Sequence, residues 1–187
     1  MIPDVLEHRL AEHCAPTLLG AKAASLLSLS REEFPELPQA LRRYNRTLYR
    51  TGLRFLILRE TSQRSLILVF RPALLRSRLN TAGAKALLQR FDYPETDCLG
   101  VLLRRLKKRF TPGGDFPHEI GLFLDYPPED VEAFIAGSSQ CKLCGYWKVY
   151  GDVDGARERF ACYDACRLCL CRMLAAGNTI SQLLQTA

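Results

Sequence analysis

Cys14 and His118 are two residues whose types and order in the sequence are typical of thiol catalysis. A helix is expected over residues 15–29, which places Cys14 immediately before it, where the helix dipole and free backbone N–H groups lower a thiol's pKa. His118 is expected where a loop enters a strand. A cysteine at a helix start and a later histidine at a strand start follow the chain order of papain-like thiol enzymes. The sequence therefore makes Cys14 a candidate nucleophile and His118 a candidate base.

Other interpretations of these two residues remain open. Cys14 and His118 also fit a buried thiol and a loop histidine that caps backbone groups, and His13 with Cys14 fits part of a metal or haem-iron site. Glu119 would point to the opposite face of a strand from His118, which makes it a poor orienting group for the histidine. The candidates for that orienting role are Asp115, Asp125 and Asn80.

Arg71 ends an apolar strand just before Pro72. An arginine at the end of a strand, beside a sheet edge, can bind a carboxylate or phosphate, although it equally fits a pair with a neighbouring acid. Together with Cys14 and His118, it gives the first functional hypothesis, a thiol-dependent or ligand-binding pocket for a small anionic ligand. In that pocket Arg71 would be the anion clamp.

Six cysteines lie in the last third of the chain. The turn formed by Cys141, Cys144 and Gly145 is typical of a metal knuckle, and Cys162 and Cys166 lie one helical turn apart. Their spacing is close to that of structural zinc sites and gives a second hypothesis, a zinc or iron–sulfur protein. Two alternatives are a reversible dithiol switch and ordinary packing, because the same helix has an apolar stripe of Phe160, Tyr163, Leu170, Met173 and Leu174. Cys169 continues the face of Cys162 and Cys166, whereas Cys171 points elsewhere.

Basic side chains give a third hypothesis, a non-enzymatic protein that binds an acidic partner. Five of the six residues 104–109, at the end of a predicted helix, are arginine or lysine, and cations at this place complement the helix dipole. Four further arginines fall on exposed positions of another predicted helix, namely Arg42, Arg43, Arg46 and Arg50. These faces also fit simple solvation. No pattern of a recognition helix or an RNA-binding domain is present, so nucleic acid is not the expected partner.

The elements that must position these residues follow from the apolar pattern. Helices are expected over 15–29, 38–51, 81–90 and 96–109, with Thr81 and Thr96 as N-caps, and over 154–176 and 179–186. A hairpin is expected from strands 53–59 and 65–70, and further strands at 119–124 and 146–150. A short helix that starts at Pro127 and Pro128 and ends at Gly137 connects these last two strands. Strand, helix and strand over 119–150 predict a right-handed parallel βαβ unit.

These elements predict an α/β (mixed α+β) fold in which a small mixed sheet of about four strands is flanked by helices. The length of 187 residues fits a single domain, 1–187, and the composition of 48% hydrophobic and 25% charged residues is that of a globular protein. The first residues are acidic rather than signal-like, and no apolar run is long enough to cross a membrane, so a cytoplasmic location is expected. The net charge of +6 favours acidic partners in general.

Several segments taken together resemble a family of small uncharacterised proteins from anaerobic bacteria, which is catalogued only as a domain of unknown function. The resemblance covers about residues 10–177 and rests on Cys14-Ala15-Pro16-Thr17-Leu18, Phe70-Arg71-Pro72, Pro117-His118-Glu119-Ile120-Gly121, Glu129-Asp130-Val131 and Trp147-Lys148-Val149-Tyr150. It implies no activity. The positions that it suggests for a shared site are Cys14, Lys22, Arg71, His118, Glu119, Lys148 and Tyr150, of which Lys22, Arg71, Glu119, Lys148 and Tyr150 would bind a ligand.

Overall fold

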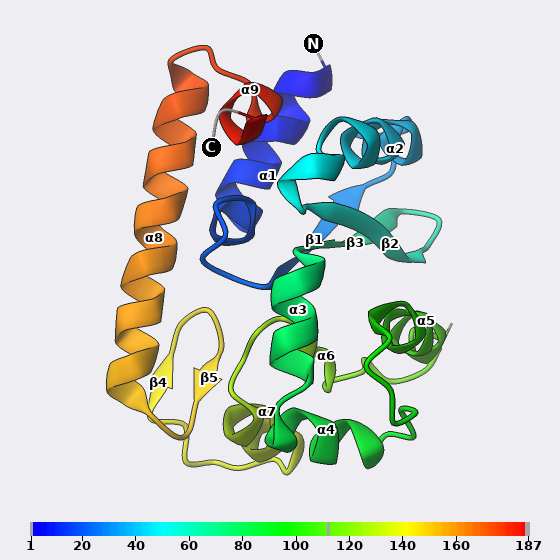
Figure 1. The fold of residues 1–187 in the computed structure, drawn as a ribbon, viewed down its shortest axis with the longest axis vertical. Coiled ribbons are helices and arrows are strands. Elements are labelled where there is room, and N and C mark those ends of the chain that lie inside the picture. Colours follow the sequence, from blue (N-terminus) through cyan, green and yellow to red (C-terminus); the bar gives the residue numbers. More distant parts are fainter. Residues whose placement is uncertain (1, 112, 186–187) are drawn as a thin grey trace. The chain divides into compact units, whose positions relative to one another are not determined.

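The structure is a computed structural model that describes residues 2–111 and 113–185 (Figure 1). The chain divides into two compact units, which are described one after the other. Unit 1 takes residues 1–72 and 163–187, and unit 2 takes residues 73–162. The expectation of one domain stays a prediction.

Unit 1 is built on a three-stranded antiparallel sheet in the order β1-β3-β2. The predicted hairpin is confirmed, because β2 pairs with β3 in antiparallel register from Arg54 opposite Phe70 to Glu60 opposite Ser65. The elements of this unit are α1 (Ile2–Leu18), β1 (Ala24–Ser30), α2 (Leu37–Thr47), the 3-10 helix η1 (Tyr49–Thr51), β2 (Arg54–Glu60), β3 (Arg64–Phe70), the C-terminal part of α8 (Val153–Ala175) and α9 (Ile180–Gln185).

The predicted helix over 15–29 is wrong. The helix instead begins at Ile2 and ends at Leu18, followed by Gly20 with a positive φ of 86°. Residues Ala24–Ser30 form β1, in which Leu27 and Leu29 are buried while Ser28 between them is exposed. The leucines of this segment therefore follow the period of a strand, and pairing with β3 stabilises that conformation. The predicted helix over 38–51 is confirmed as α2 followed by η1, and it ends at the left-handed Gly52.

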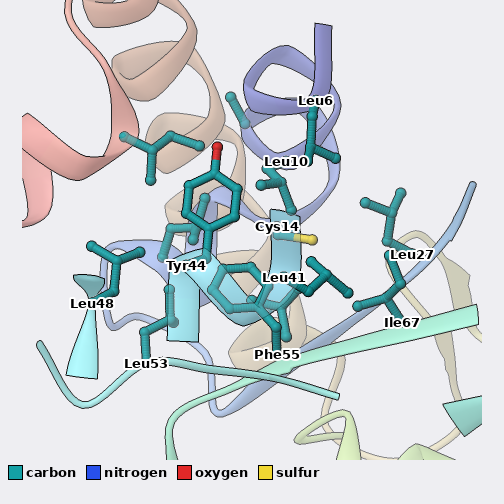
Figure 2. Packing of buried hydrophobic residues seen from close by; sticks show 14 of the residues in the cluster. Leu6, Leu10, Cys14, Leu27, Leu41, Tyr44, Leu48, Leu53, Phe55 and Ile67 are labelled. Carbon is teal, nitrogen blue, oxygen red and sulfur yellow. The ribbon is translucent and has the colours of Figure 1, made fainter. Parts of the chain in front are cut away.

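The core of unit 1 lies between the sheet and the helices α1, α2 and α9. Figure 2 shows side chains of α1, α2 and the sheet, such as Leu10, Leu41 and Phe55, packed together in this core. A buried carboxylate, that of Glu7, connects three helices at its edge. It accepts hydrogen bonds from the Tyr44 hydroxyl at 3.1 Å and from the Ile180 backbone N–H at 3.0 Å. This contact holds α9 beside α1, as Figure 1 shows.

Unit 2 is largely helical. Its elements are α3 (Pro72–Leu79, which starts at the last residue of unit 1), α4 (Ala82–Gln89), α5 (Leu99–Arg109), α6 (Ile120–Phe123), α7 (Pro128–Ile135), the short strands β4 (Leu143–Cys144) and β5 (Lys148–Val149), and the N-terminal part of α8. Thr81 caps α4 as predicted, since its hydroxyl accepts a hydrogen bond from the Ala84 N–H. Thr96 does not cap α5, because that helix begins at Leu99 with Cys98 at the N-cap.

Two predictions for unit 2 are wrong. Residues 119–124 form no strand, since Ile120–Phe123 is a single helical turn that is buried throughout. An apolar run this short fits either conformation, and here Gly121 lies so close to α7 that an added Cβ would come within 2.7 Å of Val131. The parallel βαβ unit is also absent among the described residues, because the strand near residue 148 pairs with β4 in antiparallel register. The mixed α+β class itself is confirmed, with helices flanking the sheets.

Within residues 2–111 and 113–185, no helix combines the length and the apolar character that are needed to cross a membrane.

Candidate functional site

Cys14 lies well inside α1 and not before a helix. Its side chain is completely buried in the core of unit 1, among the apolar residues that Figure 2 labels around it. Burial raises the pKa of the Cys14 thiol from 9.0 to about 12, against an opposing effect of the nearby Lys22 charge. The predicted lowering of this pKa is therefore wrong. The reason is the helix start, which is at Ile2, so the N-terminal dipole does not act on Cys14.

Arg71 and Lys22 both lie in unit 1, as does Cys14. The Arg71 guanidinium donates hydrogen bonds to three backbone carbonyl oxygens, those of Thr17 at 2.7 Å, Thr51 at 3.0 Å and Leu18. These backbone contacts use the face that an anion clamp would need, so the geometry favours a helix-capping role for Arg71. Lys22 is buried, and its Nζ lies 5.6 Å from the centre of the Tyr163 ring.

His118 belongs to unit 2, whereas Cys14 and Arg71 belong to unit 1. It lies in the turn before α6 rather than at the start of a strand, and its side chain is exposed. The imidazole packs against two partly exposed rings, with ring centres 5.8 Å from Phe116 and 5.1 Å from Phe134. The Nζ atom of Lys148 lies over the same Phe134 ring, 5.5 Å from its centre. The structure therefore brings His118 and Lys148 together around Phe134, in an aromatic and cationic surface patch.

Glu119 is buried next to a tyrosine and an arginine. One carboxylate oxygen, Oε1, accepts hydrogen bonds from Tyr93 at 3.2 Å and from Arg109 at 2.8 Å. The second, Oε2, has no hydrogen-bond partner among the described residues. Burial and the Glu119 charge raise the pKa of Tyr93. These contacts hold α5 to the segment before α6, which makes Glu119 an internal ion-pair partner rather than a surface ligand contact. Of the proposed orienting acids, Asp125 pairs with Arg78 at 2.8 Å.

Asp130 is a buried acid that lies in one of the segments of the family resemblance but is not among the predicted site residues. Its carboxylate accepts hydrogen bonds from Trp147 Nε1 at 2.8 Å and from the backbone N–H groups of Tyr150 at 2.7 Å and Gly151 at 2.8 Å. Tyr150, a predicted ligand residue, thus contributes its backbone to an internal network. The signal in the sequence was an acid in the first turn of a helix, a common and therefore unspecific position.

The predicted metal site stays a prediction, since Cys141, Cys144 and Cys162 lie in unit 2 and Cys166 lies in unit 1. None of the eight cysteines forms a disulfide. In the part of the chain that the structure describes, no three or more His, Cys, Asp or Glu side chains form a group able to hold a metal ion. Cys141 and Cys144 are exposed, and the Cys141 thiol donates a hydrogen bond to the Leu143 carbonyl oxygen, with Sγ 3.3 Å from that oxygen. The turn that follows Cys144 packs on α8 through aromatic rings, and the ring centres of Trp147 and Phe160 are 4.6 Å apart.

The predicted apolar stripe on α8 is not buried along its whole length, since Met173 is 40% exposed.

A groove of about 370 Å³ runs along β1 in unit 1. It contains cationic side chains from α1 and β3, among them Arg9 and Arg64. Both guanidinium groups already have partners. That of Arg9 forms an ion pair with the Glu33 carboxylate, with N and O 3.7 Å apart, and that of Arg64 donates hydrogen bonds to the hydroxyl and the carbonyl oxygen of Ser28, both at 2.8 Å. The groove therefore offers little uncompensated charge to an anionic ligand.

The exposed side of α2 and η1 carries a denser positive charge. We call the side chains of Arg42, Arg43, Arg46 and Arg50 the arginine face; all four are exposed, as the sequence predicted. None of the four side chains has a hydrogen bond or ion pair among the described residues. Between Glu36 and Glu60 the chain contains six arginines and neither an acid nor a lysine. No carboxylate from α2 itself therefore neutralises the arginine face.

A comparison with curated proteins gave no match, and neither did a comparison with solved structures. One family model matches the chain over residues 10–184, and its description is a protein of unknown function, DUF3793. The match covers almost the whole chain, which confirms the expected membership of a family that is known only as a domain of unknown function. This chain therefore belongs to the DUF3793 family.

Proposed function

We propose that this protein is a non-enzymatic interaction protein that binds an acidic partner protein through the arginine face of unit 1. The observation that carries the proposal is the absence of charge partners for Arg42, Arg43, Arg46 and Arg50 among the described residues. A cytoplasmic location is part of the proposal, since eight cysteines without a disulfide fit a reducing compartment.

The arginine face is arranged at a cost to the isolated protein. Arg42 and Arg46 are four residues apart on α2, so their like charges are neighbours on the helix surface. Such a pair destabilises a helix by about 0.2–0.5 kcal/mol when no acid lies between its members. A helix whose surface served only solubility would relieve this repulsion with an acid at a neighbouring position. An acidic partner would relieve it on binding.

The choice of arginine over lysine supports a specific contact. Arginine outnumbers lysine twenty to six in the whole chain, and the arginine face contains no lysine. The planar guanidinium binds a carboxylate through two parallel hydrogen bonds, which an ammonium group does not match. Next to this face, Tyr49 is 67% exposed and stacks against Arg54 with the guanidinium 4.3 Å from the ring centre. Exposed tyrosine and arginine are the residue types that protein interfaces favour.

A binding assay with two matched variants tests the proposal. The probes are a labelled poly-glutamate peptide and a labelled single-stranded DNA of similar charge. The α2 variant carries Arg42→Gln, Arg43→Gln and Arg46→Gln. The control carries Arg104→Gln, Lys107→Gln and Lys108→Gln on α5, three exposed cations of equal total charge in unit 2.

We expect the α2 variant to bind the peptide roughly tenfold more weakly and the control to bind it nearly as the unmodified protein does. Binding by the unmodified protein should also weaken as salt increases. An equal loss in both variants would mean that only the net charge matters, and the arginine face would not be the site. Tighter binding of the DNA than of the peptide would contradict an acidic protein as the partner.

A further inference from the structure

Four sulfur-containing side chains lie in one line along α8. They are Cys162, Cys166, Cys169 and Met173, and their spacings of four, three and four residues place them on the same face of a single helix. We call these four residues the sulfur strip. Cys162 and Cys169 are exposed and Cys166 is half-buried. Cys171 lies on the same helix but away from this face.

The exposure of the sulfur strip is unusual for its residue types. Cysteine and methionine are among the most often buried residues. Leu170 and Leu174 of α8 belong to the core of unit 1 and the half-buried Cys166 packs against it, whereas Cys162 and Cys169 are exposed. Met173 is 40% exposed. The chain contains two methionines, of which one is Met1. The other, Met173, lies in line with three cysteines, at a position where core packing does not explain the choice of methionine.

The sulfur strip suits a soft metal ion with few ligands. Thiolates and thioethers are soft ligands that suit monovalent copper, and structural zinc, which thiolates also bind, takes four ligands in a tetrahedron. Four side chains along one straight helix do not converge on a single point. This agrees with the finding that no three or more His, Cys, Asp or Glu side chains among the described residues form a group able to hold a metal ion. Neighbours on a helix have Cβ atoms about 5–6 Å apart. Metal–sulfur bonds of about 2.3 Å on each side of one ion span such a gap.

We propose that α8 binds a monovalent copper ion between the sulfurs of Cys166 and Cys169, with the Met173 thioether as an additional ligand. Each thiol releases its proton when the metal binds, and the oxidation state of the copper does not change. Cys162 extends the sulfur strip by one turn on the same helix. This site is independent of the arginine face.

Competition with a chromogenic copper(I) chelator under anaerobic conditions tests the proposal. The starting protein carries Cys141→Ser and Cys144→Ser, because that exposed pair of thiols is a second place where copper can bind. The key variants are Cys169→Ser and Met173→Leu, both at exposed positions where the fold is expected to tolerate the change. Cys171→Ser is the matched control, since it removes a thiol from the same helix on another side. Circular dichroism establishes that each variant keeps its helices.

We expect the starting protein to retain one copper(I) ion against the chelator. Cys169→Ser should weaken binding by on the order of a hundredfold, since even residues that only support metal ligands contribute about 10–100-fold. Met173→Leu should have a smaller effect, and Cys171→Ser should have little. Equal losses in Cys169→Ser and Cys171→Ser would overturn the proposal. So would a starting protein that gives up all its copper to the chelator, or one that binds zinc more tightly than copper(I).

Discussion

The guanidinium of Arg71 lies at the C-terminal end of α1, where its Nε donates a hydrogen bond to the carbonyl oxygen of Thr17 at 2.7 Å. The last carbonyl groups of a helix have no partner inside the helix, and in α1 this arginine supplies one from the end of β3. The same guanidinium reaches the Thr51 carbonyl oxygen at the end of η1. Arg71 therefore joins three elements of unit 1 at one point.

Replacing Arg71 by methionine should destabilise the protein. Arg71→Met retains much of the side chain's length but leaves three carbonyl oxygens without this donor, and we expect the free energy of unfolding to fall by about 2–4 kcal/mol. Urea denaturation measures this change. Arg50→Met is the control, because Arg50 is exposed and its side chain has no hydrogen bond or ion pair in the described part of the chain. The effect of this substitution should stay within about 0.5 kcal/mol. Similar effects of the two substitutions would contradict the capping role.

Cys14 should be chemically inert in the folded protein. Its thiol is completely buried, and its pKa of about 12 leaves almost no thiolate at neutral pH. Treatment with iodoacetamide should therefore label the exposed thiols, such as Cys98 and Cys169, and leave Cys14 unmodified until urea is added. Mass spectrometry of the digested protein measures labelling at each cysteine. Rapid labelling of Cys14 in the native state would restore it as a candidate nucleophile.

The same thiol should make the protein less stable at alkaline pH. Above about pH 9 the unfolded chain loses the Cys14 proton, whereas the folded chain keeps it up to about pH 12. The unfolded state then binds fewer protons, so the free energy of unfolding falls as the pH rises through this window. The slope contributed by Cys14 is about 1.4 kcal/mol per pH unit.

Comparison with Cys14→Ala isolates this contribution, because Tyr44 and Tyr93, whose pKa values are also raised, titrate in both proteins. At neutral pH the variant should be less stable by about 1 kcal/mol, owing to the cavity that the lost sulfur leaves. Denaturation at increasing pH should show this difference shrink and then reverse above about pH 10. A difference that stays constant from pH 8 to about pH 10.5 would show that the Cys14 pKa is not raised.

The sequence was informative where apolar periodicity and local signals agree. Both kinds of signal are present in the β2–β3 hairpin, at the start of α4 with its Thr81 cap, and in the long helix α8. The segment around Leu26 misled because five leucines fit a helical face, while the real determinant is pairing with β3, a partner far along the chain. Residues 120–123 misled because a short apolar run that is buried on all sides has no period to distinguish strand from helix.

The surroundings of the candidate site residues were predicted less well than the fold. Placing Cys14 at a helix start depended on the wrong helix boundary, and boundaries are the part of a sequence-based assignment that tertiary contacts change most. The arginine face was predicted because surface arginines on an amphipathic helix follow directly from its period. The grouping of His118 and Lys148 around Phe134 depends on contacts between distant segments, and no local pattern encodes it.

Asp130 should be essential for the stability of unit 2. Its buried carboxylate accepts three hydrogen bonds, so Asp130→Ala should leave the Trp147 indole N–H and two backbone N–H groups without acceptors. We expect a loss of about 3 kcal/mol in the free energy of unfolding and a shift of the fluorescence to longer wavelength as water reaches Trp147. Trp147 is the one tryptophan of the chain, which makes this signal specific to unit 2. The neighbouring substitution Glu129→Gln, at an exposed position, should change neither quantity.

Gly145 is required by the close approach of an aromatic ring. A Cβ atom added at Gly145 would lie 2.3 Å from Cε2 of Phe160, whose ring is also in contact with Trp147. Gly145→Ala should therefore destabilise unit 2 by about 1–3 kcal/mol, because the ring has to move within packed surroundings. Urea denaturation followed by Trp147 fluorescence measures the loss.

A double substitution separates this steric effect from a simple preference of the turn for glycine. If the ring is the cause, Gly145→Ala should cost less when Phe160→Leu is already present, with a coupling of about 1 kcal/mol between the two sites. Gly100→Ala is the control of opposite sign. That glycine is exposed in the first turn of α5, and the nearest atom to an added Cβ is 4.0 Å away, so alanine there should stabilise the helix by up to about 1 kcal/mol. Additive effects of Gly145→Ala and Phe160→Leu would place the requirement for glycine in the backbone of the turn between Cys144 and Trp147.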